Sequence, residues 1–177
     1  SILSKGSAAL GNRFRIGAFL NQLTQNYSQS YLTFISILAT ENNTTVNFSN
    51  IATGVVLVNN ATAGNNPGII NLNSGESYVL AVQGPTNANR DGLIGSLVTS
   101  DKPIVVNCGS FAGSNGELSN LDLGFDQIVP AERTGNEFIF IKSNGQTNVE
   151  RVLLIADQDN TEVFTDGNLV PITTLNA

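Results

Sequence analysis

This chain is built from short apolar segments that follow one another at regular spacing. Each segment has the length of a β-strand and is rich in β-branched residues, and Gly, Asn, Asp or Pro separates almost every pair. No segment with convincing amphipathic helical spacing competes with them. We therefore predict strands at residues 13–20, 30–38, 44–48, 53–59, 77–83, 93–99, 103–108, 137–142, 151–156 and 161–165.

The spacing of these segments predicts an all-β fold, an antiparallel β-sandwich of Greek-key or jelly-roll type. Residues 138–141 and 152–155 are apolar on both faces, which is typical of central strands covered on both sides. A chain of 177 residues with 41% hydrophobic residues is long enough to bury one sizeable core.

The composition argues against two classes of partner. Only 12% of the residues are charged and the formal net charge is −6, so the chain lacks a surface that neutralises nucleic-acid phosphates. No apolar run approaches the roughly 20 residues of a membrane-spanning helix, and we expect no membrane insertion. The first residues lack the apolar core of a signal peptide and Met is absent at position 1, which favours a processed or excised end.

The sequence contains an internal repeat. LGNRFRIGAFLN at 10–21 aligns with TGNEFIFIKSNG at 134–145, and ILATENNTTVNF at 37–48 aligns with LIADQDNTEVFT at 154–165. The matched positions are Gly11/Gly135, Asn12/Asn136, Phe14/Phe138, Ala39/Ala156, Asn43/Asn160, Thr44/Thr161 and Val46/Val163.

The repeat predicts the domain organisation. We expect a first β-sandwich repeat at 1–127 and the opening strands of a second, truncated repeat at 128–177, because the second copy stops in mid-pattern. Two arrangements fit: a fragment of a longer tandem array, or a fold that closes by borrowing strands across the repeat. The two copies then form either one sandwich or two.

The repeated turn has two interpretations. Asp157, Asp159 and Asn160 alternate as oxygen ligands do in calcium loops, but the glycine and the distal glutamate of an EF-hand are missing. The first copy carries Thr40, Asn42 and Asn43 at the positions of Asp157, Asp159 and Asn160. We favour a hairpin turn, in which Asn and Asp adopt left-handed φ and bond the local backbone. A calcium site or a glycan-contacting loop is the alternative, and we predict no metal or cofactor site.

The sequence argues against catalysis. It contains no His, which excludes Ser-His-Asp and Cys-His arrangements and ordinary zinc sites. The candidate acids Glu41, Asp157 and Asp159 lie in predicted turns, where solvated carboxylates are expected. We predict no catalytic residue and no enzymatic activity. The single cysteine, Cys108, ends an apolar strand and is expected to be a buried, unreactive thiol.

Five stretches resemble the N-terminal domain of IgGFc-binding proteins. They are GNRFRIGAFLN (11–21), LTFISILATENNTTVNFS (32–49), INLNSGESYVL (70–80), LIGSLVTSDKPIVVNCGSFAG (93–113) and DQIVPAERTGNEFIFI (126–141). The most specific is SDKPIVVNCGS followed by DQIVPAERTGNEF. The family occurs in mucus-associated animal proteins and in large bacterial surface proteins, including adhesins exported by type 9 secretion. The resemblance implies a β-sandwich-like fold and a setting outside the cell, without a defined ligand.

These observations predict a non-enzymatic, extracellular or cell-surface adhesin or binding module within a larger tandem-repeat secreted protein. Its expected partners are a surface glycan or protein ligand and neighbouring repeats or subunits of the same protein. The alternative is a structural subunit of an extracellular filament or sheath, assembled by strand exchange between neighbours. A carbohydrate-active accessory domain is disfavoured, because only 7% of the residues are aromatic and Trp is absent.

Overall fold

A computed structural model describes residues 4–21, 32–58, 67–83, 87–114, 122–145 and 152–177. Eight strands form one antiparallel sheet: β1 (Gly11–Arg15), β2 (Leu20–Asn21), β3 (Leu32–Ala39), β4 (Thr44–Ser49), β5 (Ile70–Leu72), β6 (Ser77–Gln83), β7 (Leu97–Ser114) and β8 (Asp122–Gln127). Two more strands, β9 (Thr161–Val163) and β10 (Thr173–Leu175), form a separate hairpin. The predicted all-β antiparallel fold is confirmed.

The helical elements are short. They are the 3-10 turns η1 (Gly6–Ala9) and η3 (Ala131–Arg133) and the α-helix α1 (Asn87–Asp91). In the part of the chain that the structure describes, no helix has the length and apolar character needed to cross a membrane.

Strand β7 is the centre of the sheet. Its residues 97–100 pair with β4, and residues 97–99 also pair with β1 on the other edge. Its residues 104–110 pair with β3, and residues 107–110 also pair with β8 on the other edge. Its last residues, 113–114, pair with β2. Residues 101–103 lie between the two halves, where the register against β1 shifts. Pro103 is tolerated within this long strand because it lies at the bend, where the ladder is interrupted.

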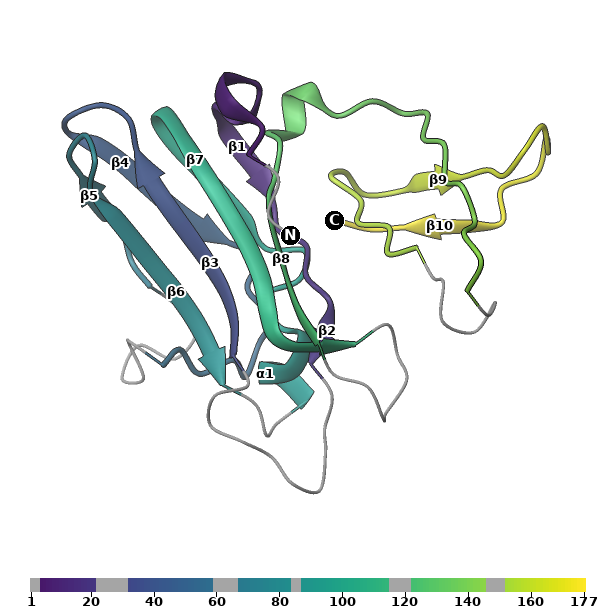
Figure 1. The fold of residues 1–177 in the computed structure, drawn as a ribbon, viewed down its shortest axis with the longest axis horizontal. Helices are drawn as coiled ribbons and strands as arrows, with labels where there is room; N and C mark the ends of the chain where they lie inside the picture. Colours follow the sequence, from purple (N-terminus) through teal and green to yellow (C-terminus); the bar gives the residue numbers. More distant parts are fainter. Residues whose placement is uncertain (1–3, 22–31, 59–66, 84–86, 115–121, 146–151) are drawn as a thin grey trace.

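The sheet curls over at one end, so that its two halves face each other (Figure 1). The β3–β4 turn, the β5–β6 turn and the bend in β7 all lie at this end. The two halves enclose one core, because the inward side chains of both belong to a single buried cluster. Its members include Phe14, Ile16, Ile35, Ile37, Val46, Leu57, Leu80, Leu93, Val82, Val98, Ile104 and Val106.

Polar side chains join the three bends to one another. The hydroxyl of Thr40 donates to the carbonyl of Pro103 at 2.6 Å, and the hydroxyl of Ser74 donates to the carbonyl of Thr40 at 3.0 Å. The backbone N–H of Asn43 donates to Oδ1 of Asn73 at 3.2 Å. Asn43 has φ 54°, a left-handed conformation that Asn adopts more readily than most residues. The curl is therefore held by hydrogen bonds as well as by the core.

The C-terminal segment lies beside the sheet (Figure 1). The chain leaves the sheet after η3 and ends in the β9–β10 hairpin. All strands of the large sheet fall within residues 11–127, and both strands of the small one fall within 161–175.

Several predicted strands differ from the observed ones. Residues 53–59 do not form a strand where the structure describes them: Gly54, with φ 86°, lies in a turn, and Leu57 makes an isolated bridge to Val82. The predictions at 93–99 and 103–108 are wrong as separate strands, because β7 runs through both. The segment 13–20 is divided between β1 and β2. The strands β5, β8 and β10 and the helical elements η1, α1 and η3 were not predicted from the sequence.

The predictions at 137–142 and 151–156 are also wrong for the residues that the structure describes. Residues 137–142 and 152–156 form no strand, and most of their side chains are exposed rather than covered on both faces. The physical reason is the lack of a partner: β7, which orders β1, β3 and β4 in the first part of the chain, is already paired on both edges. An unpaired strand is not stable by itself.

We predict that Val106→Ala lowers the free energy of unfolding by about 2 kcal/mol, because it removes two methyl groups from the centre of the core. Val105→Ala is the matched control, since Val105 is the neighbouring β7 residue on the outer face and is only partly buried. Chemical denaturation of both variants measures the difference. Equal losses of stability would contradict the inward orientation of Val106.

Candidate binding surface

An aromatic cluster lies on the outer face of the sheet, over β3, β7 and β8. Gly109 on β7 is registered between Phe34 of β3 and Phe125 of β8. A Cβ atom at Gly109 would lie 2.2 Å from Cβ of Phe125, so the position has no room for a side chain. The rings of Phe34 and Phe125 are 6.0 Å apart, and that of Phe111 is 5.3 Å from Phe34. We call Phe34, Phe111 and Phe125 the aromatic cluster.

The aromatic cluster is accessible. Phe111 is 51% exposed, and Phe34 and Phe125 are partly buried. Tilted rings at these separations attract one another, so the cluster is a preformed surface rather than three independent side chains. Aromatic residues are enriched at the centres of protein interfaces because they bury a large area with few rotatable bonds.

A groove of about 470 Å³ lies on the opposite face of β7 and β8 from the aromatic cluster, because Cys108, Gly124 and Asp126 line it and alternate with Gly109 and Phe125 along the strands. The ring of Phe19 covers Gly124 on one side, where a Cβ atom would meet the ring at 2.3 Å. Leu153 contributes to the lining from the C-terminal segment. The lining is mainly apolar: Gly17, Ala18, Phe19, Cys108, Gly109, Leu123, Gly124, Phe125, Asp126, Ile128 and Leu153.

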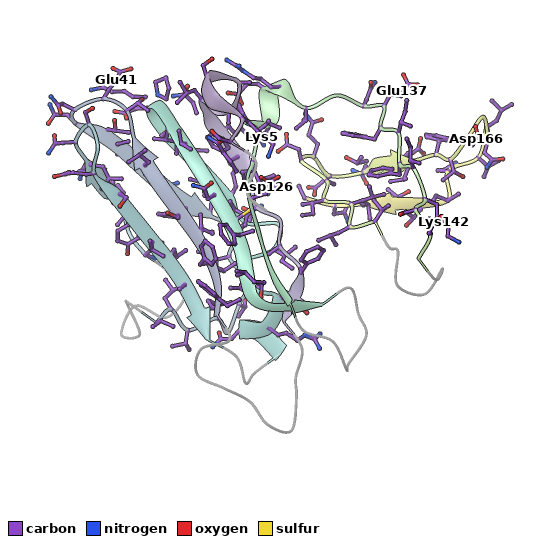
Figure 2. The ribbon with its side chains drawn as sticks, in the orientation of Figure 1. Lys5, Glu41, Asp126, Glu137, Lys142 and Asp166 are labelled. Atoms are coloured by element: carbon purple, nitrogen blue, oxygen red, sulfur yellow. The ribbon has the colours of Figure 1, made fainter. Side chains whose placement is uncertain are left out.

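One charged pair marks the edge of the groove. Nζ of Lys5 lies 2.7 Å from the carboxylate of Asp126, and the backbone N–H of Lys5 donates to Oε1 of Gln127 at 2.6 Å. Figure 2 shows Lys5 and Asp126 pointing toward each other. The pair fastens the N-terminal residues to β8, which forms a wall of the groove.

The thiol of Cys108 also belongs to this groove. Its Sγ donates to the carbonyl of Gly17 at 2.7 Å, and the side chain is buried. Burial raises the pKa of Cys108 to about 11. The predicted burial of this cysteine is confirmed.

Asp157 connects the C-terminal segment to the sheet. Its carboxylate accepts a hydrogen bond from the guanidinium of Arg13, and its backbone carbonyl accepts one from Arg15 at 2.8 Å. Nε of Arg15 lies 3.5 Å from Oδ1 of Asp157. Beside this ion pair, the space above Gly17 is filled by Ile155, whose Cδ1 would lie 2.6 Å from an added Cβ. Asp157 therefore makes a junction between the two parts of the chain.

The other members of the predicted acidic turn have different partners. Oδ1 of Asp159 accepts the backbone N–H of Ala177 at 3.0 Å. Asn160 has φ 58° and donates its backbone N–H to Oδ1 of Asn176 at 3.0 Å. The structure thus places Asp157 against the sheet. Asp159 and Asn160, which precede β9, are hydrogen-bonded to the residues that follow β10. Among the described residues, no group of three His, Cys, Asp or Glu side chains could hold a metal ion.

The same hydrogen bonds occur in the turn that precedes β4. The hydroxyl of the turn's threonine donates to the carbonyl three residues earlier in both places: Thr44 to Glu41 at 2.8 Å and Thr161 to Gln158 at 2.7 Å. The preceding Asn has left-handed φ in both. The backbone N–H of this left-handed Asn donates to the side chain of a second Asn, which follows β5 or β10. The acceptor is Asn73 in the first turn and Asn176 in the second. The glutamate of the first turn, Glu41, is exposed at its tip (Figure 2).

The aromatic cluster and the Arg13–Asp157 junction were not predicted from the sequence. Both depend on contacts between residues far apart in the chain, and each partner alone has an ordinary sequence context. Gly109 within the apolar run of β7 was the available signal, because an isolated glycine in a strand often marks a close approach.

We predict that Asp157→Asn loosens the C-terminal segment by about 1 kcal/mol, which corresponds to about fivefold faster limited proteolysis between β8 and β9. Arg13 holds the pKa of Asp157 below its ordinary value of 3.8, so the carboxylate contributes fully above that pH. Its contribution is lost as the pH falls through the lowered pKa, where wild type and variant should become alike. Asp159→Asn is the control, because the amide oxygen still accepts the N–H of Ala177. Equal cleavage of both variants at neutral pH would contradict the junction.

We predict that Cys108 in the folded protein reacts with a disulfide reagent at pH 8 at least about 100-fold more slowly than in the urea-unfolded chain. The raised pKa keeps the thiol protonated and the groove wall shields it. Release of the chromophore from the reagent measures both rates. Comparable rates would show that the thiol is accessible.

No curated protein and no solved structure matches the chain. The model of the family described as IgGFc binding protein matches residues 1–177, the full span of the sequence. The chain belongs to the IgGFc-binding protein family.

Proposed function

We propose that this chain is a non-enzymatic, extracellular adhesin or binding module within a tandem-repeat surface protein. Membership of a family described by binding to a protein supports a binding role. The aromatic cluster carries the proposal, because it combines an exposed ring at Phe111 with two supporting rings. Exposed apolar surfaces of this kind mark interaction sites on folded proteins.

The ligand that this surface fits is a protein or glycoprotein. The three rings of the aromatic cluster present an apolar surface with Phe111 at its most exposed point. An apolar side chain of a partner would pack against the exposed ring of Phe111. Several modules in one protein would add their weak contacts through effective concentration.

Binding to two immobilised probes tests the proposal: the Fc fragment of immunoglobulin G, which the family description names, and a mucin-type glycoprotein. We expect the wild-type chain to bind one of them, and Phe111→Ala to weaken this binding about tenfold or more. Val79→Ala is the matched control, since Val79 is a similarly exposed apolar residue on β6. Equal binding by both variants would contradict the role of the aromatic cluster.

A second candidate is a structural subunit of an extracellular filament or sheath, assembled by strand exchange between neighbouring chains. The exposed apolar side chains of residues 138–141 and 152–154 favour it, because they lack cover in the described chain. Polymer formation by the purified protein without any ligand would favour this candidate over the binding module.

A further inference from the structure

We propose that the C-terminal segment is an acceptor for a β7-type strand, the strand that completes the second repeat unit. This inference rests on the tandem-repeat part of the proposed function and is independent of the ligand. The acceptor is formed by residues 137–141, 152–156 and β9, which are the counterparts of parts of β1, β3 and β4.

The turn geometry supports the correspondence. The β9–β10 hairpin reproduces the β4–β5 pairing position by position, since Thr161 faces Leu175 as Thr44 faces Leu72. One further hydrogen bond is shared. In both hairpins, the backbone N–H of the second residue after β5 or β10 donates to the side chain of the residue before the left-handed Asn. It joins Ser74 to Asn42 in one turn and Ala177 to Asp159 in the other. The second copy therefore contains the same scaffold of strand, turn and strand.

The exposed side chains show which face is incomplete. Four core residues of the first unit are at most 1% exposed: Phe14, Ile16, Ile35 and Ile37. Their aligned counterparts are exposed by 61%, 59%, 51% and 39%: Phe138, Phe140, Val152 and Leu154. Burial of apolar side chains is favourable, so their exposure leaves a driving force for association.

The first unit identifies the occupant. Phe14 pairs with Val98, and Ile35 and Ile37 pair with Cys108 and Val106, so all three face the same strand, β7. Transferred to the second copy, a β7-type strand would run beside residues 138, 154 and 152 in turn. One strand with inward apolar residues and a bend in its middle therefore fits all parts of the acceptor.

The opposite face of the same segment is already in use. Ile155 packs over Gly17, Leu153 lines the groove, and Asp157 binds Arg13. These residues alternate with Val152, Leu154 and Ala156, as expected for a strand that touches the first unit on one side and its own core on the other. The alternation leaves Val152 and Leu154 directed toward the incomplete core.

A labelled peptide carrying residues 97–110 of this chain, with Ala at position 108, tests the acceptor. We expect it to bind the 177-residue protein saturably in fluorescence anisotropy. Phe138→Asp or Leu154→Asp should weaken this binding at least tenfold. Ile139→Asp is the matched control, because Ile139 is the neighbour on the other face, aligned with Arg15, and is already 86% exposed. Binding should survive this change.

Two outcomes would overturn the proposal. Equal binding of the peptide to wild type and Phe138→Asp, or no binding at all, would show that the segment does not accept a β7-type strand. Growth in mass with protein concentration in light scattering, abolished by Phe138→Asp, would show that a second copy of the chain is the occupant instead. Intact binding to the Fc or mucin probe in either case would leave the proposed binding role standing.

Discussion

The pairing of β7 with strands on both of its edges is the interaction on which this fold depends. Its residues 97–99 join β1 and β4, and its residues 107–110 join β3 and β8. Because β7 continues around the bend from one half of the sheet to the other, it defines the position of both. The core is then closed by Val98, Ile104 and Val106, which β7 directs inward from both halves.

The same dependence explains the contrast between the two parts of the chain. Where β7 is present, segments with the pattern of Phe14 and Ile35 become buried strands. Where no β7-type strand lies beside them, the described segments with the pattern of Phe138 and Val152 remain exposed and irregular. The β9–β10 hairpin nevertheless forms, because hydrogen bonds of Asn160 and Thr161 close the turn before it locally. Local hydrogen bonds thus specify the turns, and long-range pairing specifies the sheet.

The features that local pattern determines could be predicted from the sequence. Alternation of Val46 and Phe48 with polar residues indicated β4, and the repeated Asn-Thr pair indicated the turns. The sequence pattern did not determine which strands pair. The apolar run at 138–141 indicates that these side chains would be buried in a complete core, but it does not show whether a neighbouring strand is present to bury them. Similarly, residues 101–103 resemble a turn between two strands, whereas they form a bend within one. The aromatic cluster was beyond prediction because its three rings meet only through the register around Gly109.

Amide hydrogen exchange of the free 177-residue chain, resolved by mass spectrometry of its peptides, tests the central role of β7 most directly. We expect peptides covering 97–110 to exchange most slowly, at the rate of global unfolding, together with the paired residues of β1, β3 and β4. Residues 137–142 and 152–155 should exchange close to the rate of an unstructured chain. Slow exchange of these two segments, or fast exchange of β7 while β3 and β4 stay protected, would contradict the central role of β7.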